Sequence, residues 1–262
     1  MVDIDFYCRV YDNFLEPDIC QAYIDMFEET LTVDADKHQR LSVCYDQNGD
    51  KVCGDCDCYR TNPFEYERFG ELNQYTMKKM PKLISNYRDD CNITKTQWPE
   101  NLGFEEPKMK RFKIDGTKGH GLESHSDIWS FAGAKRLIGM LVYLNEDFSE
   151  GETYFPLFDV KVKPAVGRVL CFPSSWDYMH AGIPPRPPAK DIAKYFLMFH
   201  TVYLDENTEY RSGIDRTDRI RRDNGERWRR GEKHLYLHGC CASRWSPNMW
   251  YLQLSKNEPY GV

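Results

Sequence analysis

The strongest constraint on the fold is a series of short segments with the composition of β-strands, spread over residues 108–203. Each segment is bounded by Gly, Pro, Asn or Asp, which are typical of turns. The segments are Lys108–Ile114, Arg136–Leu144, Thr153–Phe155, Val160–Lys163, Arg168–Phe172 and Lys194–Tyr203. Many short strands separated by turn residues predict a β-sandwich or barrel as the core of the chain.

The last of these segments also predicts which side chains face the interior. A strand directs successive side chains to opposite faces of its sheet. One face is expected to carry Lys194, Phe196, Met198 and His200, and the other Leu197, Phe199 and Thr201. A lysine and a histidine therefore share a face with large apolar residues.

Two helical segments are predicted before the strands. In the first, Pro17 and Asp18 suit the first turn of a helix, and apolar residues follow at helical spacing. The second runs from Phe64 to Met80, and Pro81 is expected to follow its end. Helices followed by strands give an α+β class.

Three regions are predicted along the chain. Residues 1–107 form a helical and loop region that supports the core and belongs to the same domain, and residues 108–204 form the core. Residues 205–262 form a charged and aromatic extension. Within it, Arg211–Lys233 interleaves both signs of charge, which favours a solvated helix face over a basic patch for an acidic partner.

Composition excludes several classes of protein. The 262-residue chain is 41% apolar, which is enough for a core, and its net charge of -6 disfavours nucleic acid as a partner. Asp3 and Asp5 stand where a secretory signal would need basic and then apolar residues. The apolar run Leu137–Leu144 is too short to cross a bilayer. We therefore expect a cytoplasmic protein that does not span a membrane.

A possible metal site begins with the triplet His125-Ser126-Asp127. The triplet alone is weak evidence, since about 0.6 His-x-Asp triplets are expected by chance in a chain of this composition. His180 follows a buried strand segment and could supply a third ligand. Two His and one carboxylate can occupy one face of Fe(II) and leave positions open for a co-substrate and O₂, although zinc accepts the same ligands.

Four ordered motifs resemble the prolyl 4-hydroxylase branch of the 2-oxoglutarate- and Fe(II)-dependent dioxygenases. They are Leu141–Asn145, Glu150–Pro156, Val162–Gly167 and Phe172-Pro173, with a weaker similarity at Asn13–Asp18. The resemblance spans roughly residues 108–204. It implies a double-stranded β-helix, or jelly roll, with supporting helices at its N-terminal side.

The resemblance also implies roles for individual residues. His125, Asp127 and His180 match the metal ligands, which makes them the expected catalytic residues. Lys194 matches the residue that pairs with the distal carboxylate of 2-oxoglutarate, and Tyr143 and Thr153 fall near positions that line the co-substrate.

Three departures from the family pattern accompany these matches. Glu150 stands where the family has a glycine, and Phe112 where it often has a tyrosine. The interval from His180 to Lys194 is long, so Lys190 is an alternative to Lys194. We favour Lys194 because a strand holds its side chains more rigidly than a loop.

The implied function is hydroxylation of a prolyl residue in a peptide or protein, with formation of succinate and CO₂. The implied cofactors are Fe(II), 2-oxoglutarate and O₂, with ascorbate as a candidate reductant. The same chemistry on a lysyl residue, a free amino acid or a nucleobase is an alternative, and so is a jelly-roll binding module without catalytic activity. Intact candidate ligands argue against the binding module.

The remaining His and Cys residues leave further alternatives. His120 and Glu123 lie in a Gly-rich loop and are expected to be solvated, whereas His200 is expected in the interior, hydrogen-bonded or lining the co-substrate. The Asp-rich loop has three interpretations: a second metal site, for zinc, a loop with solvated thiols, or a disulfide. The zinc ligands would be Cys44, Cys53, Cys56 and Cys58.

Overall fold

The computed structural model describes residues 7–35, 38–40, 44–45, 51–52, 58–99, 101–113, 120–186 and 192–204. The predictions for Cys53, Cys56, Lys190 and the 205–262 extension lie outside these residues. Within them, no helix is long and apolar enough to cross a membrane.

The larger of the two main antiparallel sheets has eight strands, seven in the order β1-β13-β9-β16-β7-β5-β2 and an eighth, β6, paired to β16. Its strands are β1 (Arg9–Tyr11), β2 (Gln39–Arg40), β5 (Cys58–Thr61), β6 (Leu102–Phe104), β7 (Lys108–Lys113), β9 (Arg136–Tyr143), β13 (Val169–Pro173) and β16 (Ala193–Tyr203). The long strand β16 is central and pairs with β7 on one side and β9 on the other.

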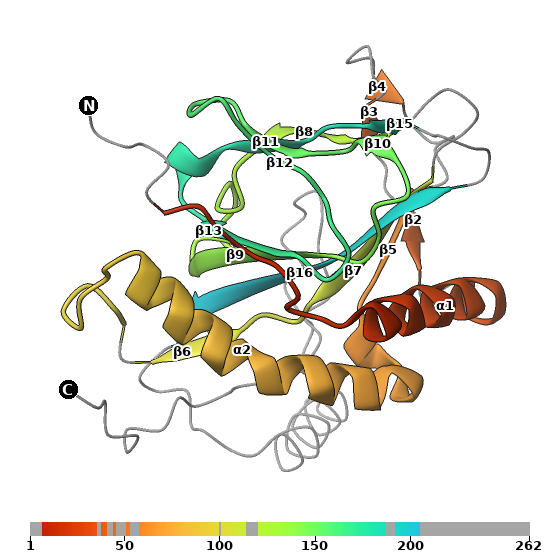
Figure 1. The fold of residues 1–262 in the computed structure, drawn as a ribbon, viewed down its shortest axis with the longest axis horizontal. Helices are drawn as coiled ribbons and strands as arrows, with labels where there is room; N and C mark the ends of the chain where they lie inside the picture. Colours follow the sequence, from red (N-terminus) through yellow and green to blue (C-terminus); the bar gives the residue numbers. More distant parts are fainter. Residues whose placement is uncertain are drawn as a thin grey trace, which may run out of the picture.

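The smaller sheet has four strands in the order β12-β11-β14-β8. They are β8 (Leu122–His125), β11 (Thr153–Phe155), β12 (Val160–Val162) and β14 (His180–Gly182). Two further pairs extend the structure, β10 (Ser149–Glu150) with β15 (Pro185–Arg186) and β3 (Cys44–Tyr45) with β4 (Lys51–Val52). The smaller sheet lies across one face of the larger sheet (Figure 1), which is the predicted jelly-roll arrangement.

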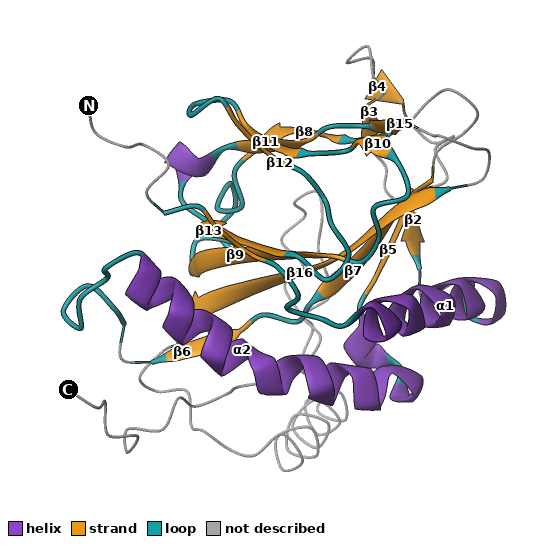
Figure 2. Cartoon of the chain, in the orientation of Figure 1, coloured by secondary structure: helices purple, strands orange, loops and turns teal. Residues whose placement is uncertain are grey.

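Two helices, α1 (Pro17–Val33) and α2 (Gly70–Asp90), cover the other face of the larger sheet (Figure 2). Three short 3₁₀ helices complete the described elements: η2 (Pro63–Glu65), η3 (Glu67–Phe69) and η4 (Trp176–Tyr178). The helices bury Tyr23, Phe27 and Met80 against this face. A second apolar cluster, which includes Phe155, Phe172 and Phe196, fills the space between the sheets. The α+β class is therefore confirmed.

The predicted end of the second helix is wrong. Helix α2 begins at Gly70, contains Pro81, and continues to Asp90. A proline inside a helix loses one backbone hydrogen bond. The buried residues Leu83, Ile84 and Tyr87 continue the apolar face beyond the proline. Their burial against the sheet stabilises the helix beyond the proline and offsets the lost hydrogen bond. A local sequence pattern does not show this stabilisation, because it comes from tertiary packing.

The six predicted strand segments are all present, with ends that differ by a residue or two. The prediction missed β8, whose four residues lack a clear alternation of apolar and polar side chains. It also missed β1, β2, β5 and β6, which come from residues before 108 and join the larger sheet. The division of the chain at residues 107 and 204 stays a prediction.

Gly167 joins the start of the chain to the barrel. Its carbonyl accepts hydrogen bonds from the backbone N–H groups of Phe14 (2.8 Å) and Leu15 (3.2 Å). Its φ of +72° suits glycine, and a Cβ atom there would lie 1.9 Å from the Leu15 carbonyl oxygen. The glycine of the Val162–Gly167 motif thus fixes where the segment leading into α1 crosses the sheet.

Candidate active site

The three predicted metal ligands come together between the two sheets. His125 ends β8 and His180 begins β14, and the two residues are directly paired in the smaller sheet. Asp127 lies in the turn that follows β8. One ligand atom from each of the three side chains lies within 4.8 Å of the others. This arrangement suits a single metal ion.

Backbone carbonyls orient both imidazoles. His125 Nδ1 lies 2.7 Å from the Glu123 carbonyl oxygen, and His180 Nδ1 lies 3.1 Å from that of Tyr178. A carbonyl oxygen only accepts, so each Nδ1 carries the hydrogen and each Nε2 keeps its lone pair for a metal. Burial lowers the pKa of His125 and lowers that of His180 to about 4. Both rings are therefore neutral at pH 7, as metal ligation requires.

Asp127 supplies a charged oxygen to this cluster. Its side chain is only 5% exposed, and burial by itself would raise its pKa. The contact with His200 and the nearby His180 and His125 outweigh burial, so the pKa of Asp127 lies below its ordinary value. Two neutral imidazoles and one carboxylate fit Fe(II) with open coordination positions, and they also fit zinc.

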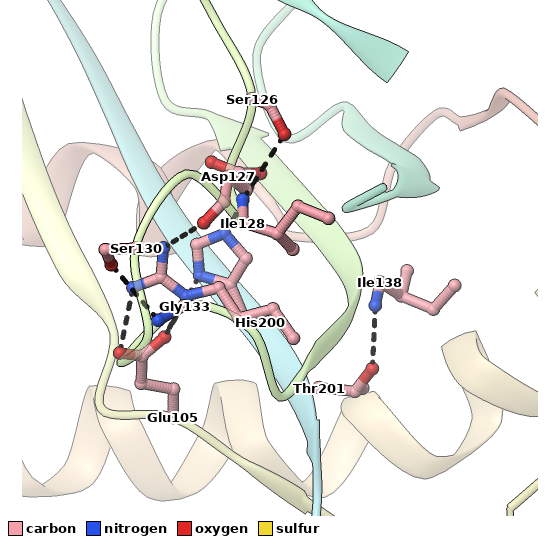
Figure 3. A network of polar contacts seen from close by, with 10 residues as sticks. Glu105, Ser126, Asp127, Ile128, Ser130, Gly133, Ile138, His200 and Thr201 are labelled. Carbon is pink, nitrogen blue, oxygen red and sulfur yellow. Dashed lines mark hydrogen bonds and ion pairs between the residues drawn. The ribbon is translucent and has the colours of Figure 1, made fainter. Parts of the chain in front are cut away.

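A polar network connects Asp127 to the larger sheet (Figure 3). His200 Nε2 lies 3.1 Å from Asp127 Oδ2, and His200 Nδ1 lies 3.5 Å from Glu105 Oε2. Arg136 makes two hydrogen bonds to the Glu105 carboxylate (2.6 and 2.9 Å) and a third to the Asp127 carbonyl (2.9 Å). The carboxylate and the backbone of Asp127 are thus both fixed to residues of the larger sheet or of the loops beside it.

Gly139 leaves the space that this contact needs. It lies opposite His200 in the pairing of β9 with β16. A Cβ atom at Gly139 would lie 3.1 Å from Asp127 Oδ2 and 2.9 Å from Cζ of Phe172. The absence of a side chain at this position allows Asp127 to approach the larger sheet closely.

A cavity adjoins His125 and His180, two of the three candidate ligands. It encloses about 470 Å³ of space, part of which is open to solvent. Its lining includes His125 and His180 at the candidate metal centre and Tyr143, Thr153 and Lys194 farther along the barrel. The cavity therefore connects the predicted ligands with the predicted co-substrate residues.

Two solved structures share this architecture. A viral collagen prolyl hydroxylase from Paramecium bursaria Chlorella virus-1, in a 2-oxoglutarate complex, is 20% identical, with a TM-score of 0.50 over 78% of this chain and 100% of that chain. A Trichoplax adhaerens prolyl hydroxylase, in complex with a peptide fragment of the hypoxia inducible factor oxygen degradation domain, is 17% identical, with a TM-score of 0.51 over 75% of this chain and 83% of that chain.

The chain has the fold of the prolyl 4-hydroxylases. A sequence match agrees with this finding: a putative prolyl 4-hydroxylase of Acanthamoeba polyphaga mimivirus is 39% identical over 72 residues. The match spans 28% of that relative's length and 23% of this chain. No protein-family model matches the chain.

Within this prolyl 4-hydroxylase fold, the predicted co-substrate residues cluster at one end of the cavity. Lys194 is 5% exposed and donates a 2.6 Å hydrogen bond to the Gly151 carbonyl. The hydroxyls of Tyr143 and Thr153 lie 2.7 Å apart, and Lys194 Nζ lies 5.7 Å from the centre of the Tyr143 ring. The three predicted residues therefore surround one place in the cavity.

Asn145, at the end of the Leu141–Asn145 motif, fixes the strand position of Lys194. The Asn145 amide donates to the carbonyl of Ala193 (2.7 Å) and accepts from the N–H of Tyr195 (2.9 Å). The backbone is thus held on both sides of Lys194, which keeps the side chain directed into the cavity. A rigid strand position was the reason for favouring Lys194 over Lys190.

The expectation for His120 is wrong. Its side chain is 7% exposed and lines the cavity, and Nδ1 lies 3.1 Å from the Lys113 carbonyl oxygen. The next residue packs closely against β14, since a Cβ atom at Gly121 would lie 2.1 Å from the Gly182 carbonyl oxygen. Glu123 is exposed, as predicted.

The structure shows the surroundings of two departures from the family pattern, Phe112 and Glu150. Phe112 is buried, lines the cavity and stacks on Phe196 at 5.7 Å, so it offers an apolar wall where a tyrosine would offer a hydroxyl. Glu150 has a φ of 59° and Gly151 a φ of 77°. A side chain in this left-handed conformation costs about 1 kcal/mol, so the Glu150 substitution carries a small energetic cost.

The proposed zinc ligands are only partly described. Cys58 is buried on β5 and pairs with Phe112 across the larger sheet. Cys53 and Cys56 lie outside the described residues. The zinc site stays a prediction.

Sequence reasoning missed Lys110, which is buried on β7 and lines the same cavity. The segment Lys108–Lys113 alternates charged and apolar residues too weakly to show which lysine points inward. The pairing of β7 with β16 decides this, because it places Lys110 beside Phe196.

Proposed function

We propose that this chain is a 2-oxoglutarate- and Fe(II)-dependent dioxygenase that hydroxylates a prolyl residue in a peptide or protein. The observation that carries the proposal is one cavity with two complementary ends. At one end, His125 and His180 line the cavity and lie with Asp127 within reach of a single ion, and the other end has the buried Lys194. A five-carbon 2-oxo diacid needs a metal at its oxo end and a cation at its far carboxylate.

The residues of the chain would bind and orient the co-substrate. His125 and His180 would present Nε2 to the metal because each Nδ1 is engaged by a carbonyl. Lys194 would bind the distal carboxylate together with hydroxyls from Tyr143 and Thr153. Iron, 2-oxoglutarate and O₂ would supply the oxidising chemistry, with succinate and CO₂ as products.

The apolar walls of the cavity would exclude water from the reaction. Phe112, Leu141 and Phe196 are buried side chains that line it. Exclusion of water strengthens electrostatic contacts and protects a reactive site from side reactions. The protein would position the reactants, provide charged contacts and exclude water, while the metal and the co-substrate would supply the oxidising chemistry.

The peptide substrate is supported by similarity and by exposed aromatic residues that lie close to the ligands in the sequence. The Trichoplax adhaerens structure of the same fold holds a peptide, and the matching mimivirus protein is a putative prolyl 4-hydroxylase. In this chain, Trp129 follows Asp127 by two residues and is 75% exposed, and Trp176 precedes His180 by four and is 74% exposed. Aromatic side chains commonly bind proline-rich peptides. The use of ascorbate and a cytoplasmic location stay predictions.

The proposal is tested by anaerobic titration of the protein with Fe(II) and 2-oxoglutarate, followed by exposure to O₂ with and without a proline-rich peptide. We expect succinate formation that the peptide stimulates, and a peptide product heavier by one oxygen atom. Asp127→Ala should abolish turnover and leave the fold intact by circular dichroism.

Two outcomes would change the proposal. Slow succinate formation that no peptide stimulates would keep the oxygenase and reject that peptide as substrate. A folded protein that does not bind 2-oxoglutarate would overturn the enzyme and leave the jelly-roll binding module.

A further inference from the structure

Lys110 is a second buried cation in the cavity. It lies on β7, its side chain is 8% exposed, and it lines the cavity together with Lys194. None of the described residues that line the cavity is an Asp or Glu. Among the described residues, Lys110 also makes no hydrogen bond or ion pair, whereas Lys194 donates to the Gly151 carbonyl.

The sheet register places Lys110 between Lys194 and the candidate metal centre. Along β16, Lys194 pairs with Phe112 and Phe196 pairs with Lys110, while His200 beside Asp127 lies farther in the same direction. Lys110 is therefore displaced from Lys194 by two residues along the strands, toward the metal end. Two residues of a strand span about 7 Å. Both ammonium groups contact the Phe196 ring, 5.7 Å from its centre for Lys110 and 5.4 Å for Lys194.

The charged groups that act on the two lysines agree with this placement. Burial lowers the pKa of Lys110 to about 8, and the negative charge of Asp127 opposes the shift. Burial lowers the pKa of Lys194 to about 7, with Glu152 opposing the shift and Lys110 adding to it. Lys110 thus feels the charge of Asp127, and Lys194 feels the charge of Lys110.

A buried ammonium group without a partner destabilises a folded protein. The Phe196 ring offsets part of the cost through a cation–π contact. An anion bound in the cavity would offset it far more, because a desolvated carboxylate makes a strong charge-assisted hydrogen bond to lysine. The two lysines, displaced by two residues along the strands, fit a ligand with two carboxylates.

We propose that Lys110 binds the carboxylate of the 2-oxo acid that lies next to the metal, while Lys194 binds the distal one. This inference rests on the proposed function and deepens it, because it makes the cavity selective for the charge at both ends of the co-substrate. Lys110 is then a co-substrate-binding residue at the metal-proximal end.

The test combines lysine variants with a truncated ligand. Anaerobic calorimetry on the Mn(II)-loaded protein would measure binding of 2-oxoglutarate and of 2-oxopentanoate, which lacks the distal carboxylate. Lys194→Met should weaken 2-oxoglutarate alone. Lys110→Met should weaken both ligands by a similar factor of about 10 to 100, as expected for one charge-assisted hydrogen bond. Lys110→Arg should restore part of the affinity.

Lys108→Met is the matched control, since Lys108 belongs to the same face of β7 but does not line the cavity. It should change both affinities less than twofold. Lys110→Met should also unfold at the same or a higher temperature than the wild type, because it removes an unpaired buried charge. Lys110→Gln serves as the second variant if the methionine variant does not fold.

The possible failures are distinguishable. Wild-type affinity in Lys110→Met overturns the role of Lys110 and leaves the oxygenase standing. Weakened binding of the peptide with unchanged binding of 2-oxoglutarate also overturns it, and assigns Lys110 to the substrate. Failure of the wild type to bind 2-oxoglutarate overturns the proposed function and this inference together.

Discussion

His200 Nε2 lies 3.1 Å from Asp127 Oδ2, and this contact joins the candidate metal centre to the central strand of the larger sheet. Asp127 sits in a turn after a four-residue strand, which by itself would hold a side chain loosely. His200 is 3% exposed and is fixed in β16, so the contact transfers the rigidity of the sheet to the carboxylate. Loss of such a supporting contact typically lowers metal affinity about 10- to 100-fold.

Replacing His200 should therefore weaken metal binding without removing a ligand. We expect His200→Leu to reduce Mn(II) affinity about 10- to 100-fold, and His200→Gln to reduce it less, because an amide N–H keeps a polar group beside the Asp127 carboxylate. Calorimetry without co-substrate measures the effect, and thermal unfolding controls for folding. Unchanged Mn(II) affinity in a folded His200→Leu variant would show that the contact does not position Asp127.

Gly139→Ala should disturb the same carboxylate from the other side. The added methyl would press on Asp127 Oδ2 and on the ring of Phe172, and overpacking of this kind costs about 1–3 kcal/mol. We expect lower unfolding stability together with weaker Mn(II) binding. Gly70→Ala is the control, since nothing lies within 4 Å of a Cβ atom there. Equal metal affinity in Gly139→Ala and Gly70→Ala would contradict this account.

Co-substrate affinity should fall as the pH rises above 7 to 8. Burial lowers the pKa of Lys194 to about 7 and that of Lys110 to about 8, while a bound dicarboxylate favours the protonated form of each. Binding is therefore strongest below these values, and above them it must take up protons. We expect up to about a tenfold loss per pH unit for each lysine that must gain its proton.

Calorimetry in buffers of different ionisation enthalpy, between pH 6.5 and 9.5, would measure both the affinity and the protons taken up. His180, with a pKa of about 4, stays neutral over this range. Affinity that is constant from pH 6.5 to 9.5 would show that both lysines keep their protons in the empty cavity.

Trp129→Ala should weaken the peptide substrate and leave 2-oxoglutarate binding unchanged. The side chain is exposed and two residues from Asp127, and truncating an interface aromatic commonly costs more than about 1 kcal/mol. We expect KM for the peptide to rise at least about fivefold. Val33→Ala, at the exposed end of α1, is the control for loss of an exposed apolar side chain. A similar KM in both variants would remove Trp129 from the peptide site.

Local patterns were sufficient for much of this architecture. The strand segments and the first helix follow from spacing and from turn residues, because these signals depend on neighbours in the chain. The alternation in β16 correctly separated Lys194 and Phe196, which line the cavity, from Leu197 and Phe199, which pack in the core under the helices. The position of Pro81 inside α2 did not follow, because the packing of Leu83 and Tyr87 overrides a local helix signal.

The sequence by itself determined the order of the motifs, and with it the jelly-roll fold and the set of candidate ligands. Only the tertiary structure decided how these residues meet. His125 pairs with His180 across β8 and β14, His200 supports Asp127 through the gap at Gly139, and Lys110 points into the cavity beside Phe196. Each of these contacts depends on the register between strands that are far apart in the chain. A local pattern carries no information on that register, because long-range strand pairing is set by the packing of the whole barrel.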